Sequence, residues 1–81
     1  MVIVDYDPEF LRTFKKLDNN LKIRVEKALI KIIESPETGK PMRYTRKGTR
    51  EVYISPFRLS YAYLPGENKI IILNLYHKDE Q

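Results

Sequence analysis

The chain has 81 residues, no cysteine and a formal net charge of +4. This length allows one small domain, residues 1–81, and the lack of cysteine excludes disulfides and thiolate metal sites. Met1–Asp5 lacks the basic start of a signal peptide and is too short for its apolar region, and no apolar run approaches the roughly 20 residues of a membrane span. We therefore expect a cytoplasmic protein that does not contact a membrane.

The positive charge is concentrated between residues 40 and 58. Six basic side chains and one acidic one, Glu51, give this segment a charge of +5, so the rest of the chain is slightly acidic. The six are Lys40, Arg43, Arg46, Lys47, Arg50 and Arg58. Such a patch attracts polyanions such as RNA or DNA, although a plain solvated loop would have the same composition.

The first half predicts a strand followed by two helices. Met1–Tyr6 is rich in β-branched residues and is typical of a strand. Asp7 can cap a helix that Pro8 begins, and its apolar face would comprise Phe10, Leu11, Phe14 and Leu17. Asp18-Asn19-Asn20 can cap a second helix, which Ser35-Pro36 ends. Its apolar stripe would comprise Leu21, Val25, Ala28, Leu29, Ile32 and Ile33.

The second half predicts a basic connector and three strands. The connector spans Pro36–Lys47, and strands are expected at Arg50–Ile54, Phe57–Tyr63 and Lys69–Tyr76, with a tight turn at Pro65–Asn68. The order β-α-α-β-β-β predicts an α+β fold. In this fold an N-terminal strand and an αα-hairpin precede a mainly antiparallel three-stranded β-meander that packs on the helices.

Alternation in the strand Phe57–Tyr63 separates two faces. Leu59 and Tyr61 would pack on the helices with Phe57 and Tyr63, while Arg58 would face away beside Ser60 and Ala62. Small neighbours around an arginine indicate a shallow anion pocket. A cross-strand pair between Arg58 and Glu51 is an equally good interpretation.

The same alternation in the last strand places Ile71, Leu73 and Leu75 toward the helices. It places Asn74 and Tyr76 on the side of Arg58. His77 and Lys78 follow directly after this strand, where pleating no longer fixes their direction. A lone histidine is more often structural than catalytic, but one beside a lysine near a basic surface is a candidate for acid–base chemistry.

Several segments in this order resemble the RelE/ParE toxin superfamily of toxin–antitoxin systems. They are Phe10-Leu11-x-x-Phe14-x-x-Leu17, Glu34-Ser35-Pro36, Gly39-Lys40-Pro41-Met42, Arg50-Glu51-Val52-Tyr53-Ile54, Phe57-Arg58-Leu59-Ser60-Tyr61 and Leu75-Tyr76-His77-Lys78-Asp79-Glu80. The likeness covers nearly the whole chain. It implies a toxin that either cuts mRNA on the ribosome or inhibits DNA gyrase. It also implies an antitoxin, which binds the toxin in a hetero-oligomer and silences it. A remnant toxin that only binds nucleic acid is a third interpretation.

For RNA cleavage, the resemblance implies a metal-independent endoribonuclease without a cofactor. Arg58 would clamp the scissile phosphate, Lys78 would stabilise developing charge, His77 would act as acid or base, and Arg50 would replace strand lysines found in cleaving members. Those members have lysines where this chain has Glu51 and Tyr53. RNA would also contact Lys40, Arg43, Arg46 and Lys47, and Tyr76 would stack on a base. Acidic residues of the antitoxin would meet the same basic segment.

Overall fold

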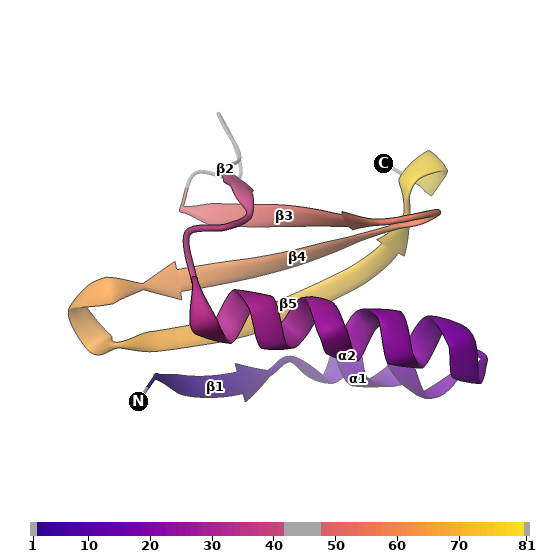
Figure 1. The fold of residues 1–81 in the computed structure, drawn as a ribbon, viewed down its shortest axis with the longest axis horizontal. Helices are drawn as coiled ribbons and strands as arrows, with labels where there is room; N and C mark the ends of the chain where they lie inside the picture. Colours follow the sequence, from indigo (N-terminus) through magenta and orange to yellow (C-terminus); the bar gives the residue numbers. More distant parts are fainter. Residues whose placement is uncertain (1, 42–47, 81) are drawn as a thin grey trace.

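The computed structural model describes residues 2–41 and 48–80, and its first half is a strand followed by an αα-hairpin (Figure 1). The elements are β1 Ile3–Tyr6, α1 Pro8–Lys15 and α2 Asn19–Glu34. Both predicted caps are present: Asp7 accepts the N–H of Glu9 at 2.8 Å, and Asp18 accepts that of Leu21 at 2.9 Å. Each carboxylate satisfies a backbone donor that the first helical turn leaves unpaired, so the helices begin where the sequence predicts.

The described residues form a five-stranded sheet in the order β1-β5-β4-β3-β2. Its later strands are β2 Lys40–Pro41, β3 Thr49–Ile54, β4 Phe57–Leu64 and β5 Lys69–His77. The predicted α+β class and the β3-β4-β5 meander are confirmed, whereas two pairings were not expected. β1 lies parallel to β5 at one edge, and β2, which falls in the predicted connector, adds a two-residue strand at the other.

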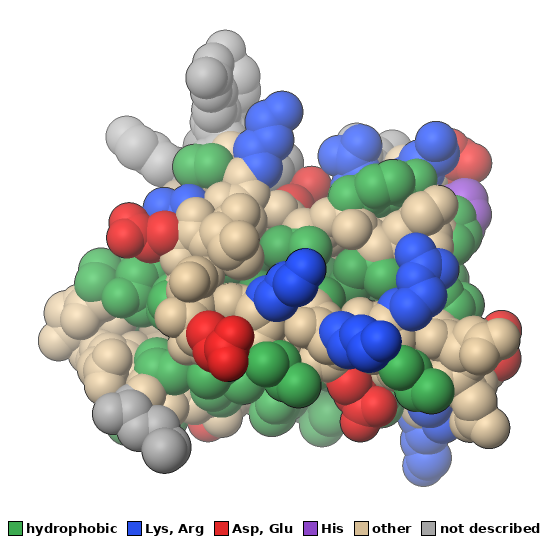
Figure 2. Space-filling model, viewed as in Figure 1, with side chains coloured by type: hydrophobic (Ala, Val, Ile, Leu, Met, Phe, Trp, Pro, Cys, Tyr) green, Lys and Arg blue, Asp and Glu red, His purple; other side chains and the backbone are tan. Residues whose placement is uncertain are grey.

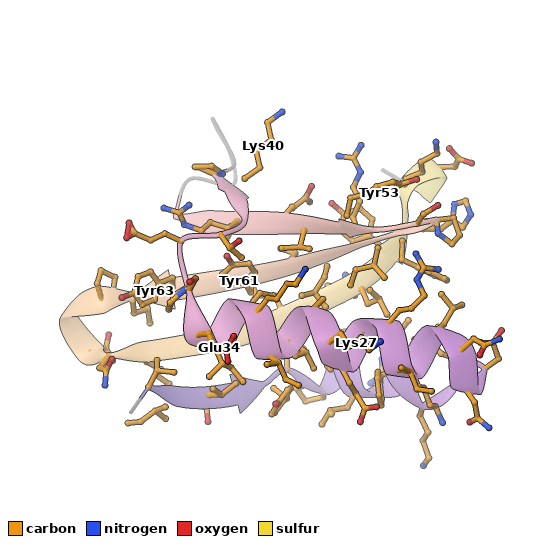
Figure 3. All side chains as sticks on the ribbon, in the orientation of Figure 1. Lys27, Glu34, Lys40, Tyr53, Tyr61 and Tyr63 are labelled. Atoms are coloured by element: carbon orange, nitrogen blue, oxygen red, sulfur yellow. The ribbon has the colours of Figure 1, made fainter. Side chains whose placement is uncertain are left out.

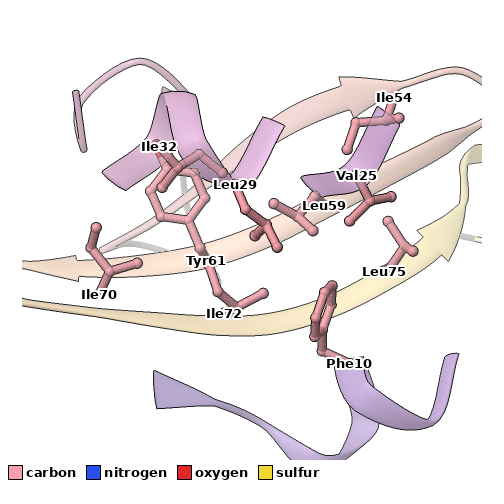
Figure 4. Close-up of a cluster of buried hydrophobic side chains, with 10 residues drawn as sticks. All are labelled: Phe10, Val25, Leu29, Ile32, Ile54, Leu59, Tyr61, Ile70, Ile72 and Leu75. Carbon is pink, nitrogen blue, oxygen red and sulfur yellow. The ribbon is translucent and has the colours of Figure 1, made fainter. Parts of the chain in front are cut away.

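The core lies between α2 and one face of the sheet, and α1 closes it beside β5 (Figure 4). Ten buried hydrophobic side chains form it: Phe10, Val25, Leu29, Ile32, Ile54, Leu59, Tyr61, Ile70, Ile72 and Leu75. Leu59 and Tyr61 are fully buried, and Phe57 and Tyr63 pack against the same cluster. The alternation predicted for β4 is therefore confirmed. No helix in the described ranges has the length and apolar character to span a bilayer.

One prediction for β5 is wrong. Ile71 and Leu73 were expected to face the helices, but Ile70 and Ile72 are the buried residues. The register explains the difference: Ser60 pairs with Asn74 while Tyr61 pairs with Ile72, so Leu73 has no partner of its own on β4. This extra residue reverses the alternation, and Leu75 beyond it still points into the core as predicted.

Candidate functional site

The face of the sheet that points away from the helices carries a group of three polar side chains, one from each central strand. We call it the open-face cluster: Glu51 on β3, Arg58 on β4 and Tyr76 on β5. Arg58 lies opposite Tyr76 in the register, and Glu51 lies opposite Ser60, two residues along β4 from Arg58. Arg58 Nη1 is 3.4 Å from Glu51 Oε1, and the Tyr76 hydroxyl donates to Glu51 Oε2.

Burial differs sharply within the open-face cluster. Glu51 is only 7% exposed, whereas the Arg58 side chain is 39% exposed. A buried carboxylate needs charged or hydrogen-bonding partners, and Arg58 and Tyr76 provide them. The predicted pair between Arg58 and Glu51 is therefore confirmed. The anion pocket stays a prediction, and the exposed part of the guanidinium is where an anion would bind.

Arg50 directly precedes Glu51 on β3, so it lies on the opposite face of the sheet, where it performs a structural task. Its Nη1 donates to the carbonyl oxygens of Glu37 at 3.0 Å and Gly39 at 2.9 Å, in the segment that joins α2 to β2. These contacts are with backbone carbonyls and do not test the predicted catalytic role of Arg50, which stays a prediction. Through these two hydrogen bonds, the Arg50 guanidinium fixes the backbone just before Lys40.

Tyr61 fixes the same segment from the core side. Its hydroxyl accepts the N–H of Gly39 at 2.9 Å and donates to the carbonyl of Pro36 at 2.7 Å. A Cβ at position 39 would lie 2.6 Å from this hydroxyl, so only glycine fits. Burial raises the pKa of Tyr61, while the hydrogen bond from Gly39 and the charge of Arg50 oppose that rise. We call Arg50 and Tyr61 the connector clamp.

His77 is not brought to the open-face cluster. It is the last residue of β5, it pairs with Phe57, and the two rings meet edge-on at 5.7 Å between centroids. Because Phe57 packs against the core, the imidazole lies on the opposite face from Arg58 and Tyr76. The N–H of Asp79 donates to His77 Nδ1 at 3.3 Å. Lys78 follows in a short 3₁₀ turn, with its side chain exposed.

The predicted RNA contacts are only partly within the described residues. Lys40 is exposed on β2 and lies opposite Glu51, next to the open-face cluster, and Tyr76 belongs to that cluster. Arg43, Arg46 and Lys47 lie outside the described residues. Within residues 2–41 and 48–80 no group of three or more acidic or histidine side chains is placed to hold a metal ion.

Sequence reasoning missed two features of this site. It treated Glu51 as a departure from a pattern of lysines or as a surface partner of Arg58, and not as the buried centre of a cluster. The available signal was spacing, since Glu51 and Tyr76 each fall on the strand face that Arg58 occupies. It also missed the role of Arg50, because backbone carbonyls serve as its acceptors and no sequence pattern marks them.

The sequence and the fold of this chain resemble those of known proteins. Residues 4–81 match the family described as the ParE toxin of type II toxin–antitoxin systems, parDE. No curated protein matches the chain. Many solved structures are similar in fold, and three of them are described next.

The isolated RelE toxin of E. coli superposes with a TM-score of 0.83 at 17% identity, and the match covers 100% of this chain and 88% of that one. The toxin–antitoxin complex RelBE2 of Mycobacterium tuberculosis gives 0.81 at 25% identity, with 95% and 98% covered. The archaeal RelE–RelB complex of Pyrococcus horikoshii gives 0.78 at 14% identity, with 99% and 98% covered. Identities this low show a shared fold and leave the site to be argued from its own residues.

Proposed function

Because the chain belongs to the ParE toxin family of type II toxin–antitoxin systems, we propose that it is a ribosome-dependent mRNA endonuclease silenced by a cognate antitoxin. The observation that carries the proposal is the open-face cluster, in which a partly exposed arginine is held by a buried carboxylate on the sheet face that points away from the helices. An antitoxin partner is supported by the similar structures RelBE of E. coli and RelBE2, both described as toxin–antitoxin complexes.

Arg58 is the proposed phosphate clamp. Cleavage by a ribose 2′-hydroxyl passes through a phosphorane that carries extra negative charge, and a guanidinium can donate two parallel hydrogen bonds to it. The bond from Arg58 to Glu51 is long, at 3.4 Å. A phosphate can therefore share the exposed edge of the guanidinium while Glu51 keeps its orientation.

Glu51 is the proposed acceptor of the 2′-hydroxyl proton. Arginine stays protonated at all relevant pH values, so it cannot take this proton, whereas a carboxylate can. Glu51 is bonded to Tyr76 in the free protein. In this proposal the 2′-hydroxyl takes the place of the Tyr76 hydroxyl on Glu51, and the freed Tyr76 ring stacks on a base.

His77 and Lys78 remain proposals for the proton donor to the leaving 5′-oxygen. Both directly follow Tyr76 in the chain, at the same end of the sheet as Arg58. Imidazole is the side-chain group best suited to exchanging a proton near neutral pH. Lys40, opposite Glu51, is proposed to contact the RNA backbone beside the cluster.

Gyrase inhibition is the second candidate, and the position of His77 favours it. The imidazole contacts Phe57 on the helix-covered face, so it is not gathered with Arg58 and Glu51 into one acid–base set. A toxin that acts only by binding gyrase needs no such set. Arg58 would then be a contact residue.

One experiment separates these functions. The chain is induced in cells, and mRNA 5′ ends and plasmid supercoiling are measured in the same culture, with the Arg58→Ala variant as control. We expect cuts phased with codons, normal supercoiling, and neither effect in the variant. Altered supercoiling without cuts would establish gyrase inhibition instead, and normal growth without either change would contradict both functions.

A further inference from the structure

Three side chains form a row across the sheet, on the face that points away from the helices. Tyr53 on β3 pairs with Arg58 on β4, and Arg58 pairs with Tyr76 on β5. Residues paired directly across strands point to the same face, so a tyrosine lies on each side of Arg58. We call these three residues the cross-strand row. The basic side chains that Figure 2 shows over α2 lie on the other side of the sheet.

Tyr53 is the most accessible tyrosine of the cross-strand row. Its side chain is 55% exposed, and within the described residues it belongs neither to the core nor to the side chains packed against the core. Its hydroxyl donates to Ser55 Oγ at 3.3 Å, which holds the ring near the end of β3, where Figure 3 labels it. An aromatic ring that is already held in place loses little entropy when a ligand binds to it.

The groups proposed for RNA cleavage follow the order of the strands. β3 carries Glu51, the proposed acceptor of the 2′-hydroxyl proton, and Tyr53 lies two residues further along on the same face. β4 carries Arg58, the proposed phosphate clamp. β5 leads into Lys78, a proposed donor to the leaving 5′-oxygen. The backbone N–H of Lys78 bonds to the β3–β4 turn at 3.0 Å, which keeps it at this end of the sheet.

This order gives the bound RNA a direction. The attacking 2′-hydroxyl belongs to the nucleotide on the 5′ side of the scissile phosphate, and the leaving 5′-oxygen belongs to the nucleotide on the 3′ side. β4 lies between β3 and β5 in the sheet. The 5′ nucleotide therefore lies over β3 and the 3′ nucleotide over β5, and Tyr53 is the ring beside the 5′ nucleotide.

We propose that Tyr53 stacks on the base on the 5′ side of the scissile phosphate and selects a purine there. Aromatic side chains bind unstacked bases through their faces, and the two fused rings of a purine offer more face than the single ring of a pyrimidine. The Tyr76 ring takes the base on the 3′ side. This inference rests on the nuclease function proposed above, and it adds the direction of the RNA and a base preference.

The arrangement favours RNA over a protein partner. Neighbouring strands lie about 4.8 Å apart, so the Cα atoms of Tyr53 and Tyr76 lie about 10 Å apart with one cation between them. A splayed dinucleotide presents the matching order, with one negative phosphate between two flat bases. The centre of a protein interface is depleted of charged groups, whereas Arg58 lies at the centre of this row.

The test titrates two uncleavable dinucleotides into the full chain and follows its labelled tyrosine rings by NMR. The first has 2′-deoxyadenosine on the 5′ side and uridine on the 3′ side, and the second has 2′-deoxyuridine on the 5′ side and adenosine on the 3′ side. Both lack the attacking 2′-hydroxyl, so neither can be cut. We expect the first to shift the ring resonances of Tyr53. Tyr53→Leu should weaken its binding about fivefold or more, and the second dinucleotide should lose less, because uracil stacks more weakly.

Two variants serve as controls. Tyr53→Phe keeps the ring but loses the hydrogen bond to Ser55, so its affinity for the first dinucleotide should stay within about twofold of the wild type. Tyr6→Leu removes another exposed tyrosine, which lies on β1 at the opposite side of the sheet and stacks on Phe10. It should bind both dinucleotides as the wild type does.

Several results would overturn the inference. These are no shift of Tyr53 at the highest dinucleotide concentration, unchanged affinity in Tyr53→Leu, an equal loss for both dinucleotides, or a larger loss for the second. The mRNA cuts made in cells are mapped in parallel. Purines should be enriched on the 5′ side of the wild-type cuts, and less so for Tyr53→Leu. If the wild type cuts no mRNA, the proposed nuclease function fails, while the titrations still decide whether Tyr53 selects a base.

Discussion

The β3–β4 pair holds its polar side chains differently on its two faces. In the connector clamp, Arg50 and Tyr61 bond to backbone atoms of Pro36, Glu37 and Gly39. In the open-face cluster, Glu51 bonds to the side chains of Arg58 and Tyr76. Backbone partners cannot leave without unfolding the segment, whereas side chains can exchange a partner for a ligand. The first arrangement therefore supports the fold, and the second is suited to binding and chemistry.

The largest expected effect comes from Glu51→Gln in the open-face cluster. Glutamine has the same shape and keeps an acceptor oxygen for Tyr76, but it cannot take a proton. If Glu51 is the base, kcat for mRNA cleavage on ribosomes should fall by about 10²–10⁴-fold with KM unchanged. Single-turnover cleavage at saturating ribosomes measures this. A fully active variant would leave Glu51 only the task of orienting Arg58.

The second largest effect is expected for Arg58→Ala. It should lower kcat for mRNA cleavage by about 10²–10³-fold, the typical effect of removing one group that stabilises transition-state charge. The thermal unfolding midpoint should fall modestly, because the buried Glu51 loses one partner while Tyr76 still donates to it and the core packing is unchanged. Arg58→Lys should recover part of the rate, since it restores the charge without the planar fork. If circular dichroism shows that the Arg58→Ala protein is unfolded, Arg58 supports the fold as Arg50 and Tyr61 do. That result would contradict the contrast drawn between the open-face cluster and the connector clamp.

Tyr61→Phe tests the connector clamp and should change stability more than chemistry. It leaves the buried N–H of Gly39 without its acceptor, which should lower the free energy of unfolding by about 1–3 kcal/mol. Denaturant unfolding measures this loss. The cleavage rate per folded molecule should change less than for Arg58→Ala. Equal stability of variant and wild type would show that water replaces the hydroxyl.

The smallest expected effect is a pH dependence of the free energy of unfolding, which arises from the Tyr61 hydroxyl. Because burial raises the pKa of Tyr61 in the folded chain, its ionised form is disfavoured there relative to the unfolded chain. The contribution to stability is complete below the unfolded pKa, about 10, and is lost as pH rises through the folded value. Unfolding free energies across this range should fall more steeply for the wild type than for Tyr61→Phe. Parallel curves would exclude the contribution.

The sequence predicted which strand residues are buried wherever apolar and polar residues alternate without interruption. Leu59 and Tyr61 alternate with polar or small residues along all of β4, so their burial followed from a period of two. Ile71 and Leu73 were misplaced because the extra residue in β5 reverses that period, and nothing in a run of isoleucine and leucine marks where this happens. Strand β2 escaped prediction because two residues ending in Pro41 carry no periodic pattern.

The candidate site was predictable to the extent that it uses side chains on neighbouring strands. The pair between Arg58 and Glu51 could be proposed from their spacing, and the structure confirms it. The contacts of Arg50 could not be proposed, because its backbone acceptors at Glu37 and Gly39 come from a connector whose path depends on the folded chain. The position of His77 also depended on tertiary structure, since pairing extends one residue beyond the predicted end of β5 and turns the imidazole toward Phe57.

The parallel pairing of β1 with β5 affects when this protein can fold during its synthesis. Ile3 lies opposite Lys69, so nearly the whole chain separates the two partners. Phe10, which α1 inserts beside β5 (Figure 4), has no complete surface to pack on until the last strand has been made. Contacts this distant in sequence form late, and a domain emerging N-terminus first must wait for them. The sheet, and any activity that depends on it, can therefore form only after β5 has been synthesised.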